Sequence, residues 1–386
     1  MLNHLLPTFQ LKQRNLLPIV QGGMGVGVSA HRLAGTVARL GGMGTISSVD
    51  LRRHHPDLMQ QTKKNADKDA INQANLTALD REIRAAKMLS EGNGAIAVNI
   101  MRALSEYANY VRQACISGAD AIVVGAGLPL DLPELTADFP DVALIPILSD
   151  SRGISLLLKK WLRKGRLPDA IVIEQPRYAG GHLGAPRLDA VNEERFEMAT
   201  VLSETQAIFS ELGIANIPLI AAGGVNSHQQ VKELLAQGAS AVQFGSAFAV
   251  TQEGDAHINF KKVLTQAKPD DIVTFMSVAG LPARAVRTPW LSNYLEKEQK
   301  LQSKAGPKAC LVGFDCLQQC GLRDGLPKAG QFCIDTQLAF ALQGDVKRGL
   351  FFRGSEALPF GSAIASVAEL MEYFLSGQKP QALAAK

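Results

Sequence analysis

The segment PLIAAGGVNSHQQVKELLAQGASAVQFGSAF (218–248) contains two short apolar runs separated by a stretch in which apolar residues recur every three or four positions. Short apolar runs that end in glycine or a polar residue are typical of parallel strands buried on both faces. The stretch between them, 227–237, predicts a helix with Ser227 at its N-cap. A similar segment, SGADAIVVGAG (117–127), also leads from a helix through glycine into a strand. The sequence therefore predicts a repeating strand–helix unit.

Eight runs of this kind occur between Pro18 and Val250, and helix candidates such as 151–164 and 194–212 lie between them. Eight strand–helix repeats favour a TIM (β/α)8 barrel, and an open doubly wound sheet is the alternative. The predicted strands are PIVQGG (18–23), GTISS (44–48), AIAVNI (95–100), AIVVGAG (121–127), ALIPIL (143–148), AIVIEQ (170–175), PLIAAGG (218–224) and AVQFGS (241–246).

Two segments depart from the repeat. Residues 50–94 follow the second predicted strand, are too long for an ordinary connection, and contain a helix candidate over 70–89, so we interpret them as a helical insertion. We expect a barrel domain over 1–250 and, packed on it, a mainly helical extension over 251–386 that holds four of the five cysteines. The helix candidates of the extension are 259–267, 291–302 and 364–376.

The composition indicates a globular protein that binds small molecules. The chain has 386 residues, of which 46% are hydrophobic and 20% charged, and its net charge of +4 is too small for a surface that binds nucleic acid or membrane. No apolar run approaches about 18 residues, so no transmembrane helix is expected. The N-terminal stretch lacks the pattern of a secretory signal, so we expect a cytoplasmic protein. A homodimer is compatible with the sequence.

Four residues after the last two predicted strands form a candidate phosphate site. In TIM barrels the functional loops follow the C-terminal ends of the strands, and the loops after strands seven and eight often hold a phosphate. Glycines allow close backbone approach, although the alternative is that they only turn the chain. Arg284 and Arg287 could also reach a phosphate, but solvated charges at a helix end are the favoured interpretation. The four candidate residues are Gly223, Gly224, Gly245 and Ser246.

The loop after the first predicted strand, QGGMGVGVS (21–29), is rich in small residues. It contains Gly-x-Gly fragments, but it lacks the full spacing of a dinucleotide-binding fingerprint and the acidic residue that accompanies it. A flat ring system across the barrel mouth would need small residues here. Gly22, Gly23 and Met24 could give such a ring its backbone contacts.

The stretch AIVIEQPRYAGGHLGAP (170–186) contains the candidate catalytic residue. Its strand ends at Glu174, and a Gly-Gly pair places His182 in a loop at the catalytic end of the barrel. A neutral imidazole there could remove or relay a proton near pH 7. The alternative is a surface or structural histidine.

These motifs occur together and in order, and the set resembles the nitronate monooxygenase family, formerly called 2-nitropropane dioxygenases. That family is similar to FMN-dependent enoyl-acyl-carrier-protein reductases and to NAD(P)H:quinone reductases. The resemblance covers roughly residues 17–287, including GLPAR (280–284). The other motifs that carry it are PIVQGGMG (18–25), AVNI (97–100), AGGH (179–182), IAAGGV (220–225) and QFGSAF (243–248).

The resemblance implies a TIM barrel with noncovalently bound FMN. It makes His182 a general base that deprotonates a nitroalkane, or a residue beside the flavin where reductant and substrate meet. Gly22, Gly23 and Met24 would contact the isoalloxazine, and Asn99 would contact a polar edge of the flavin. The residues that would contact the phosphate and ribityl chain are Gly181, Gly223, Gly224, Gly245 and Ser246. Glu174 and Gly180 are further cofactor-binding candidates.

Three functions are consistent with these motifs. The first is a nitronate monooxygenase, which uses FMN and O2 to convert an alkyl nitronate into a carbonyl compound and nitrite. The second is a reductase in which NAD(P)H reduces FMN and the flavin reduces an enoyl thioester or a quinone. The third, from another class, is a non-redox barrel that binds a phosphate ligand. The insertion and the extension depart from the short family members and could cover the barrel mouth.

The extension has a signal of its own in KACLVGFDCLQQCGLRDGLPKAGQFC (308–333). Four cysteines within 24 residues suggest a shared site, either zinc or an iron–sulfur cluster, because both accept four thiolate ligands. The spacing matches neither a standard zinc ribbon nor a ferredoxin motif. The alternatives are thiols packed as small apolar residues and redox-active thiols. The candidate metal ligands are Cys310, Cys316, Cys320 and Cys333.

Overall fold

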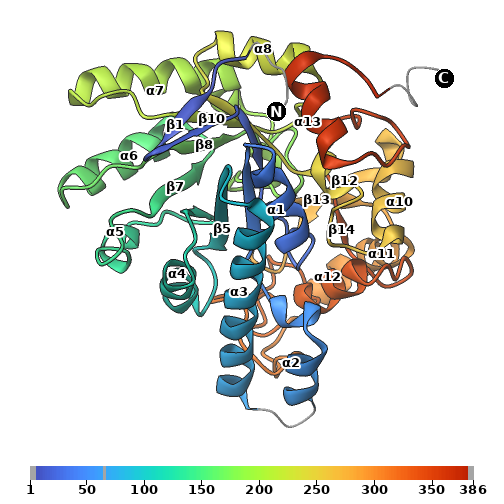
Figure 1. Ribbon diagram of the computed structural model, residues 1–386. Coiled ribbons are helices and arrows are strands. Elements are labelled where there is room, and N and C mark those ends of the chain that lie inside the picture. The colour runs from blue at the N-terminus through green and yellow to red at the C-terminus, as the bar shows by residue number, and fades with distance from the viewer. Residues whose placement is uncertain (1–5, 64–66, 381–386) are drawn as a thin grey trace.

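The computed structural model describes residues 6–63 and 67–380 and has at its centre a closed barrel of eight parallel strands (Figure 1). The strands pair in chain order, and the last, β11, pairs with the first, β3, to close the barrel. The predicted TIM barrel is confirmed, and each predicted run overlaps one of its strands. These are β3 (Ile19–Gln21), β4 (Met43–Ser47), β5 (Ala95–Met101), β6 (Ala121–Gly125), β7 (Ala143–Leu148), β8 (Ile171–Glu174), β10 (Leu219–Ala222) and β11 (Ala241–Phe244).

Alternate residues of each strand fill the barrel or face the helices outside it. On β5, Ala97 belongs to the interior cluster, whereas Val98 packs in the cluster formed with the helices. A hairpin of β1 (Phe9–Leu11) and β2 (Arg14–Leu16) adds apolar side chains to the interior cluster. An ion pair joins its turn to Asp169, two residues before β8. The hairpin therefore closes the N-terminal end of the barrel and leaves the C-terminal end for a site.

Helices cover the outside of the barrel. The predicted N-cap at Ser227 is confirmed, because its side chain accepts a hydrogen bond from the backbone N–H of Gln230. None of the helices in the described part of the chain is long and apolar enough to cross a membrane. The helices that connect the barrel strands are α1 (His31–Arg39), α3 (Lys68–Ser90), α4 (Tyr107–Ile116), α5 (Leu132–Leu135), α6 (Ser151–Leu162), α7 (Met198–Leu212) and α8 (His228–Ala236).

The eighth position of the helical ring is occupied by α13 (Val367–Ser376), from the far end of the chain. It packs against α1 and α8, and Figure 1 shows it beside α8. The ring of Phe374 stacks on that of Phe244 in β11, with centroids 4.0 Å apart. The carbonyl oxygen of Phe374 accepts a hydrogen bond from His228 Nδ1 at 2.8 Å. A division at residue 250 therefore separates α13 from the barrel that it completes.

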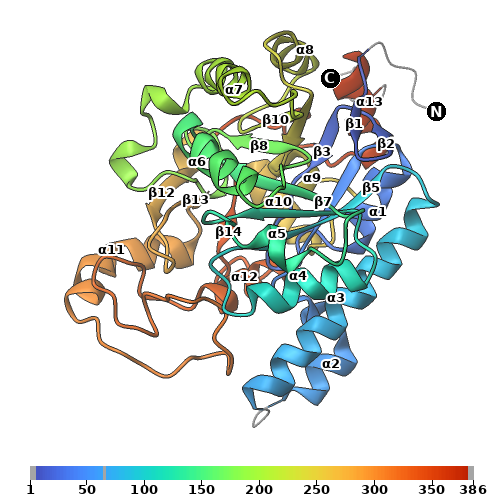
Figure 2. The ribbon, with the colours of Figure 1, turned by 90° about the vertical axis from the view of Figure 1, so that its left-hand side faces the viewer.

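The predicted insertion is only partly additional to the barrel. The helix expected over 70–89 is α3, which packs against α1 and α4 in the crossover between β4 and β5. The added part is η1 (Leu51–His54) and α2 (Pro56–Gln61), which project from the body together with one end of α3 (Figures 1 and 2). Arg53 of η1 forms an ion pair with the buried Asp335 and so ties this segment to the extension.

The extension contains a small antiparallel sheet, β12–β13–β14, that the sequence analysis did not predict. The loop after β8 also forms a short strand, β9 (Gly181–His182), which pairs with β13. The helices expected at 259–267 and 291–302 are α10 and α11. The elements between β11 and α13 are α9 (Ser246–Ala249), α10 (Ile258–Gln266), η4 (Pro269–Asp271), β12 (Ile272–Met276), β13 (Pro282–Val286), α11 (Pro289–Ser303), α12 (Ile334–Leu342) and β14 (Phe351–Phe352). Two short turns, η2 (Leu188–Ala190) and η3 (Glu194–Phe196), precede α7.

Candidate active site

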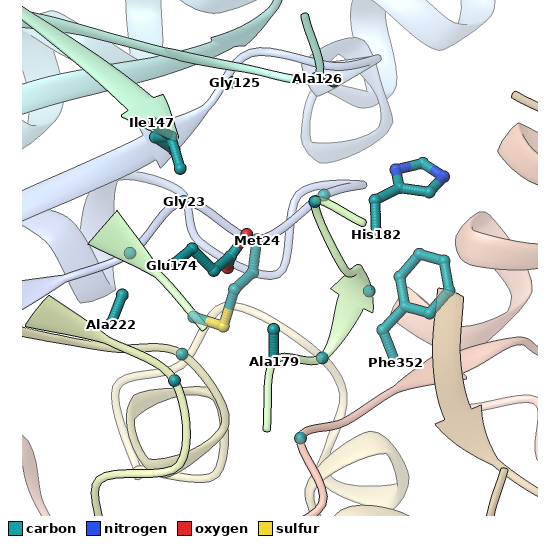
Figure 3. A pocket seen from close by; sticks show the side chains of 18 of the residues that line it. Gly23, Met24, Gly125, Ala126, Ile147, Glu174, Ala179, His182, Ala222 and Phe352 are labelled. Carbon is teal, nitrogen blue, oxygen red and sulfur yellow. The ribbon is translucent and has the colours of Figure 1, made fainter. Parts of the chain in front are cut away.

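A cavity of about 830 Å³ opens at the C-terminal ends of the barrel strands. Figure 3 shows Met24, Glu174 and His182 among the side chains that line this pocket, with the rings of His182 and Phe352 adjacent to each other. The structure brings all of the catalytic and cofactor-binding candidates of the barrel to this one cavity. They are Gly22, Gly23, Met24, Asn99, Glu174, Gly180, Gly181, His182, Gly223, Gly224, Gly245 and Ser246.

The loops after β10 and β11 form a cradle with few side chains. Gly245 has φ of −105°, and the nearest atom to a Cβ built there is the Met24 sulfur at 3.9 Å. Neither the backbone nor the packing therefore requires glycine at this position, and its missing side chain leaves cavity space free. Ser246 Oγ accepts a hydrogen bond from the backbone N–H of Gly354 at 2.9 Å. Such a cradle suits the phosphate and chain of a bound cofactor.

His182 lies on β9, where the extension holds it. Its Cα is opposite Ala283 of β13, and its Nε2 lies 3.0 Å from Ser277 Oγ. Its ring centroid is 6.0 Å from that of Phe352. Burial lowers the pKa of the imidazole to about 4, so the ring is neutral near pH 7. A neutral and oriented imidazole at the cavity wall can accept a proton from a bound substrate.

Arg284 supports the AGGH loop from β13. It is 6% exposed, and its Nη1 donates hydrogen bonds to the carbonyl oxygens of Pro176 and Ala179. The interpretation of Arg284 as a solvated charge is therefore wrong, because the guanidinium is buried between β13 and the loop after β8. Arg287 is exposed and does not line the cavity.

Glu174 brings an ionisable carboxyl group to the same cavity. It is the last residue of β8, and within the described ranges no group forms a hydrogen bond or ion pair with its carboxyl. Burial raises its pKa to about 7 because the ionised form is poorly solvated there. The carboxyl can thus be protonated or ionised near neutral pH.

The extension completes the cavity with residues that the sequence analysis missed. Ser277 and Phe352 contact His182, and Arg353 lines the cavity beside the cradle. The signal that could have marked Arg353 is GLFFRGS (349–355), where an arginine stands between two aromatic residues and a glycine. The apolar part of this wall includes Ala279, Leu281, Leu317, Ile334, Leu338 and Leu350.

The cysteines of the extension give no metal site in the structure. Among residues 6–63 and 67–380, no group of three or more His, Cys, Asp or Glu side chains is arranged to hold a metal ion. Cys310 Sγ donates instead to the carbonyl oxygen of Phe314 at 3.0 Å. Cys316 lines the cavity, and burial raises the pKa of its thiol above the usual range. All four, Cys310, Cys316, Cys320 and Cys333, are free thiols.

Comparison with solved structures agrees with the barrel. FabK from Thermotoga maritima is 22% identical and superposes with a TM-score of 0.62, covering 93% of this chain and 91% of that chain. A nitroalkane oxidase from Streptomyces ansochromogenes is 18% identical, with a TM-score of 0.61 and coverage of 93% and 94%. At these identities the likeness shows the shared fold.

Sequence comparison shows the family as well as the fold. The chain is 28% identical over 293 residues to a probable nitronate monooxygenase of Bacillus subtilis, covering 73% of this chain and 79% of that protein. It is 24% identical over 298 residues to a probable nitronate monooxygenase of Staphylococcus saprophyticus, covering 74% and 79%. The family model described as nitronate monooxygenase matches residues 10–376, nearly the whole chain. This chain therefore belongs to the nitronate monooxygenase family.

Proposed function

We propose that this chain is an FMN-dependent nitronate monooxygenase, which converts an alkyl nitronate and O2 into a carbonyl compound and nitrite. The observation that carries the proposal is His182, a half-buried and neutral imidazole fixed beside a cavity that also contains a cradle with few side chains. Family membership supports the flavin and leaves no observation in favour of a non-redox barrel. A cytoplasmic location and a homodimer stay predictions.

The residues present fit FMN. The cradle at Gly224, Gly245 and Ser246 would hold the phosphate end, and the small residues Gly22 and Gly23 would face the ring system. Space at Gly245 is left open by the protein itself, as a ligand would require. When bound, FMN supplies the acceptance of electrons from the substrate carbon and the reaction with O2.

The side chains of this protein supply proton transfer and orientation. His182 can take the proton from the carbon next to a nitro group, and Ser277 fixes the imidazole for that transfer. Protonated Glu174 can donate a hydrogen bond to an anionic substrate, whereas ionised Glu174 would repel it. The apolar wall of the extension keeps the site dry, which strengthens both effects.

A second candidate is an NAD(P)H-dependent reductase of an enoyl thioester or a quinone. The apolar wall favours it, because a small nitronate needs little apolar surface whereas an acyl chain or a quinone ring would fill it. In this function protonated Glu174 would donate a proton to the acceptor as it is reduced, and the neutral His182 would orient the acceptor.

Anaerobic mixing of the flavin-loaded protein with propionate 3-nitronate, or with NADH or NADPH, separates the two candidates. For a nitronate monooxygenase we expect the nitronate to bleach the flavin absorbance rapidly, and nitrite to appear once air is admitted. Rapid bleaching by a nicotinamide and none by the nitronate would replace the first proposal with the second. Protein that remains colourless after incubation with FMN would contradict both.

A further inference from the structure

Arg353 is a buried cation at the cavity wall that forms no ion pair with the described residues. It follows β14, and only 5% of its surface is exposed. Its Nη1 donates one hydrogen bond of 3.3 Å to the carbonyl oxygen of Gly354, while its Nε has no partner. In the described part of the chain it forms no ion pair, although nearby Glu356 favours its charged form electrostatically. An arginine stays protonated even when buried, so this charge has to be compensated.

A second buried arginine, Arg284, lies on the neighbouring strand β13. The backbone N–H of Arg353 donates to the carbonyl oxygen of Arg284 at 3.4 Å, and Arg284 is also buried without an ion pair among the described residues. The Arg284 guanidinium is already bonded to two backbone carbonyls, whereas that of Arg353 has donors to spare. Glu356 alone cannot neutralise two guanidinium charges. The region therefore favours an additional anion, and Arg353 is the group with free donors for it.

The segment that carries Arg353 lies directly against the predicted cofactor loops. The backbone N–H of Gly354 bonds to Ser246 Oγ, in the loop after β11. A Cβ at Gly180, in the loop after β8, would lie 2.5 Å from the backbone carbon of Arg353 and the backbone nitrogen of Gly354. The contact thus requires glycine at 180, and it fixes the extension against the cradle that suits a phosphate.

We propose that Arg353 binds the phosphate of FMN and makes the site select FMN over riboflavin. The inference rests on the FMN site of the proposed function and adds a side chain that the barrel strands and their loops do not supply. Guanidinium groups bind phosphate through charge-assisted N–H···O bonds, and apart from the bond from Nη1 to Gly354 the Arg353 guanidinium forms no hydrogen bond with the described residues. Riboflavin has the same ring system and ribityl chain but no phosphate, so it isolates the contribution of this contact.

The test measures binding of FMN and of riboflavin to the full-length, flavin-free protein by quenching of flavin fluorescence. For Arg353→Gln we expect FMN affinity to fall about 10- to 100-fold, with riboflavin affinity unchanged. Arg353→Lys keeps the positive charge but lacks the planar guanidinium, so its FMN affinity should lie between those of the wild type and Arg353→Gln. Unchanged riboflavin binding also shows that the variant is folded.

Arg348→Gln is the matched control, because Arg348 lies five residues earlier, is exposed and is paired with Asp345. It should leave both affinities unchanged.

An equal loss of FMN and riboflavin affinity in Arg353→Gln, or no loss at all, would overturn the inference. The inference would also be overturned if Arg353→Gln bound FMN normally but no longer discriminated between NADPH and NADH. Arg353 would then bind the phosphate that NADPH carries and NADH lacks. Wild-type protein that binds neither flavin would contradict the proposed function as well, whereas equal wild-type affinities for FMN and riboflavin would contradict the Arg353 inference alone.

Discussion

The two sides of the cavity are built differently. The barrel side consists mainly of glycine-rich loops at strand ends, and its ionisable side chains are Asp150, Glu174, Tyr178, His182 and Arg195. The extension side contributes side chains such as Ser277, Phe352 and Arg353, which contact or adjoin groups that the barrel presents. The comparison suggests that the barrel provides a general cofactor site and that the extension orients the base and sets the charge. Substitutions on the two sides should therefore have different signatures.

The largest effect is expected on the barrel side, at His182. His182→Asn keeps a polar side chain of similar size but removes the base, so kcat/KM with a neutral nitroalkane should fall by at least about 100-fold. Equilibrium binding of FMN should not change. Steady-state assays with nitrite detection, together with flavin titration, measure both. A variant with the wild-type rate would show that His182 is not the base.

Substitution of Arg284 should mainly lower the stability of the protein and not the rate of catalysis. Arg284→Met retains the aliphatic stem but leaves the carbonyl oxygens of Pro176 and Ala179 without a donor. The free energy of unfolding should fall by about 2 kcal/mol, measured by urea denaturation. Arg287→Met, at an exposed position on the same segment, is the control and should leave the denaturation midpoint unchanged. Equal midpoints for both variants would contradict the supporting role of Arg284.

Ser277 tests whether the extension orients the base. Ser277→Ala removes the partner of His182 Nε2, and kcat should fall by roughly 10-fold while KM stays constant, because orientation and not binding is lost. The rate should decline at acid pH as the imidazole, whose pKa is about 4 in the wild type, becomes protonated. The pH at which this acid limb of the rate profile falls should shift in the variant. Ser303→Ala, at an exposed position, is the control. A change in KM alone, with an unshifted acid limb, would assign Ser277 to packing.

The smallest effect is expected at Glu174, as a dependence on pH. Its pKa of about 7 means that the carboxyl is protonated below this value and ionised above it, so KM for an anionic nitronate should rise a few-fold as pH passes through 7. Glu174→Gln cannot ionise and should give a flat profile, whereas Glu211→Gln, at an exposed position, should behave as the wild type. The same rise in KM in the Glu174 variant would place the titrating group elsewhere.

The barrel was predictable because its signals are local. The run AVQFGS and its counterparts are short stretches of β-branched or apolar residues that end in glycine or a polar residue, and each corresponds to a strand whose loop reaches the cavity. The AGGH motif placed His182 correctly at the cavity, although its role stays a prediction.

The extension was less predictable because its contacts are long-range. β13 begins at Pro282 and β14 has two residues, so neither has the pattern of a strand. Ser277 meets His182 across 95 positions of sequence, and Gly354 meets Ser246 across 108. The cysteine spacing suggested a metal, but the structure does not bring the four thiols into a metal-binding arrangement. Pairing across such separations depends on the folded chain and leaves no periodic trace in the sequence.

The position of α13 bears on the order in which the molecule can be made. Because α13 fills the gap in the helical ring between α1 and α8, the cysteine-containing segment is a loop inserted between β11 and its closing helix. During synthesis the barrel strands emerge first, but the surface around Phe244 stays uncovered until Phe374 has also left the ribosome. The segment that lines the cavity is therefore made before the helical ring around the barrel can close. A chain ending at residue 250 would expose that apolar surface permanently and would be expected to aggregate.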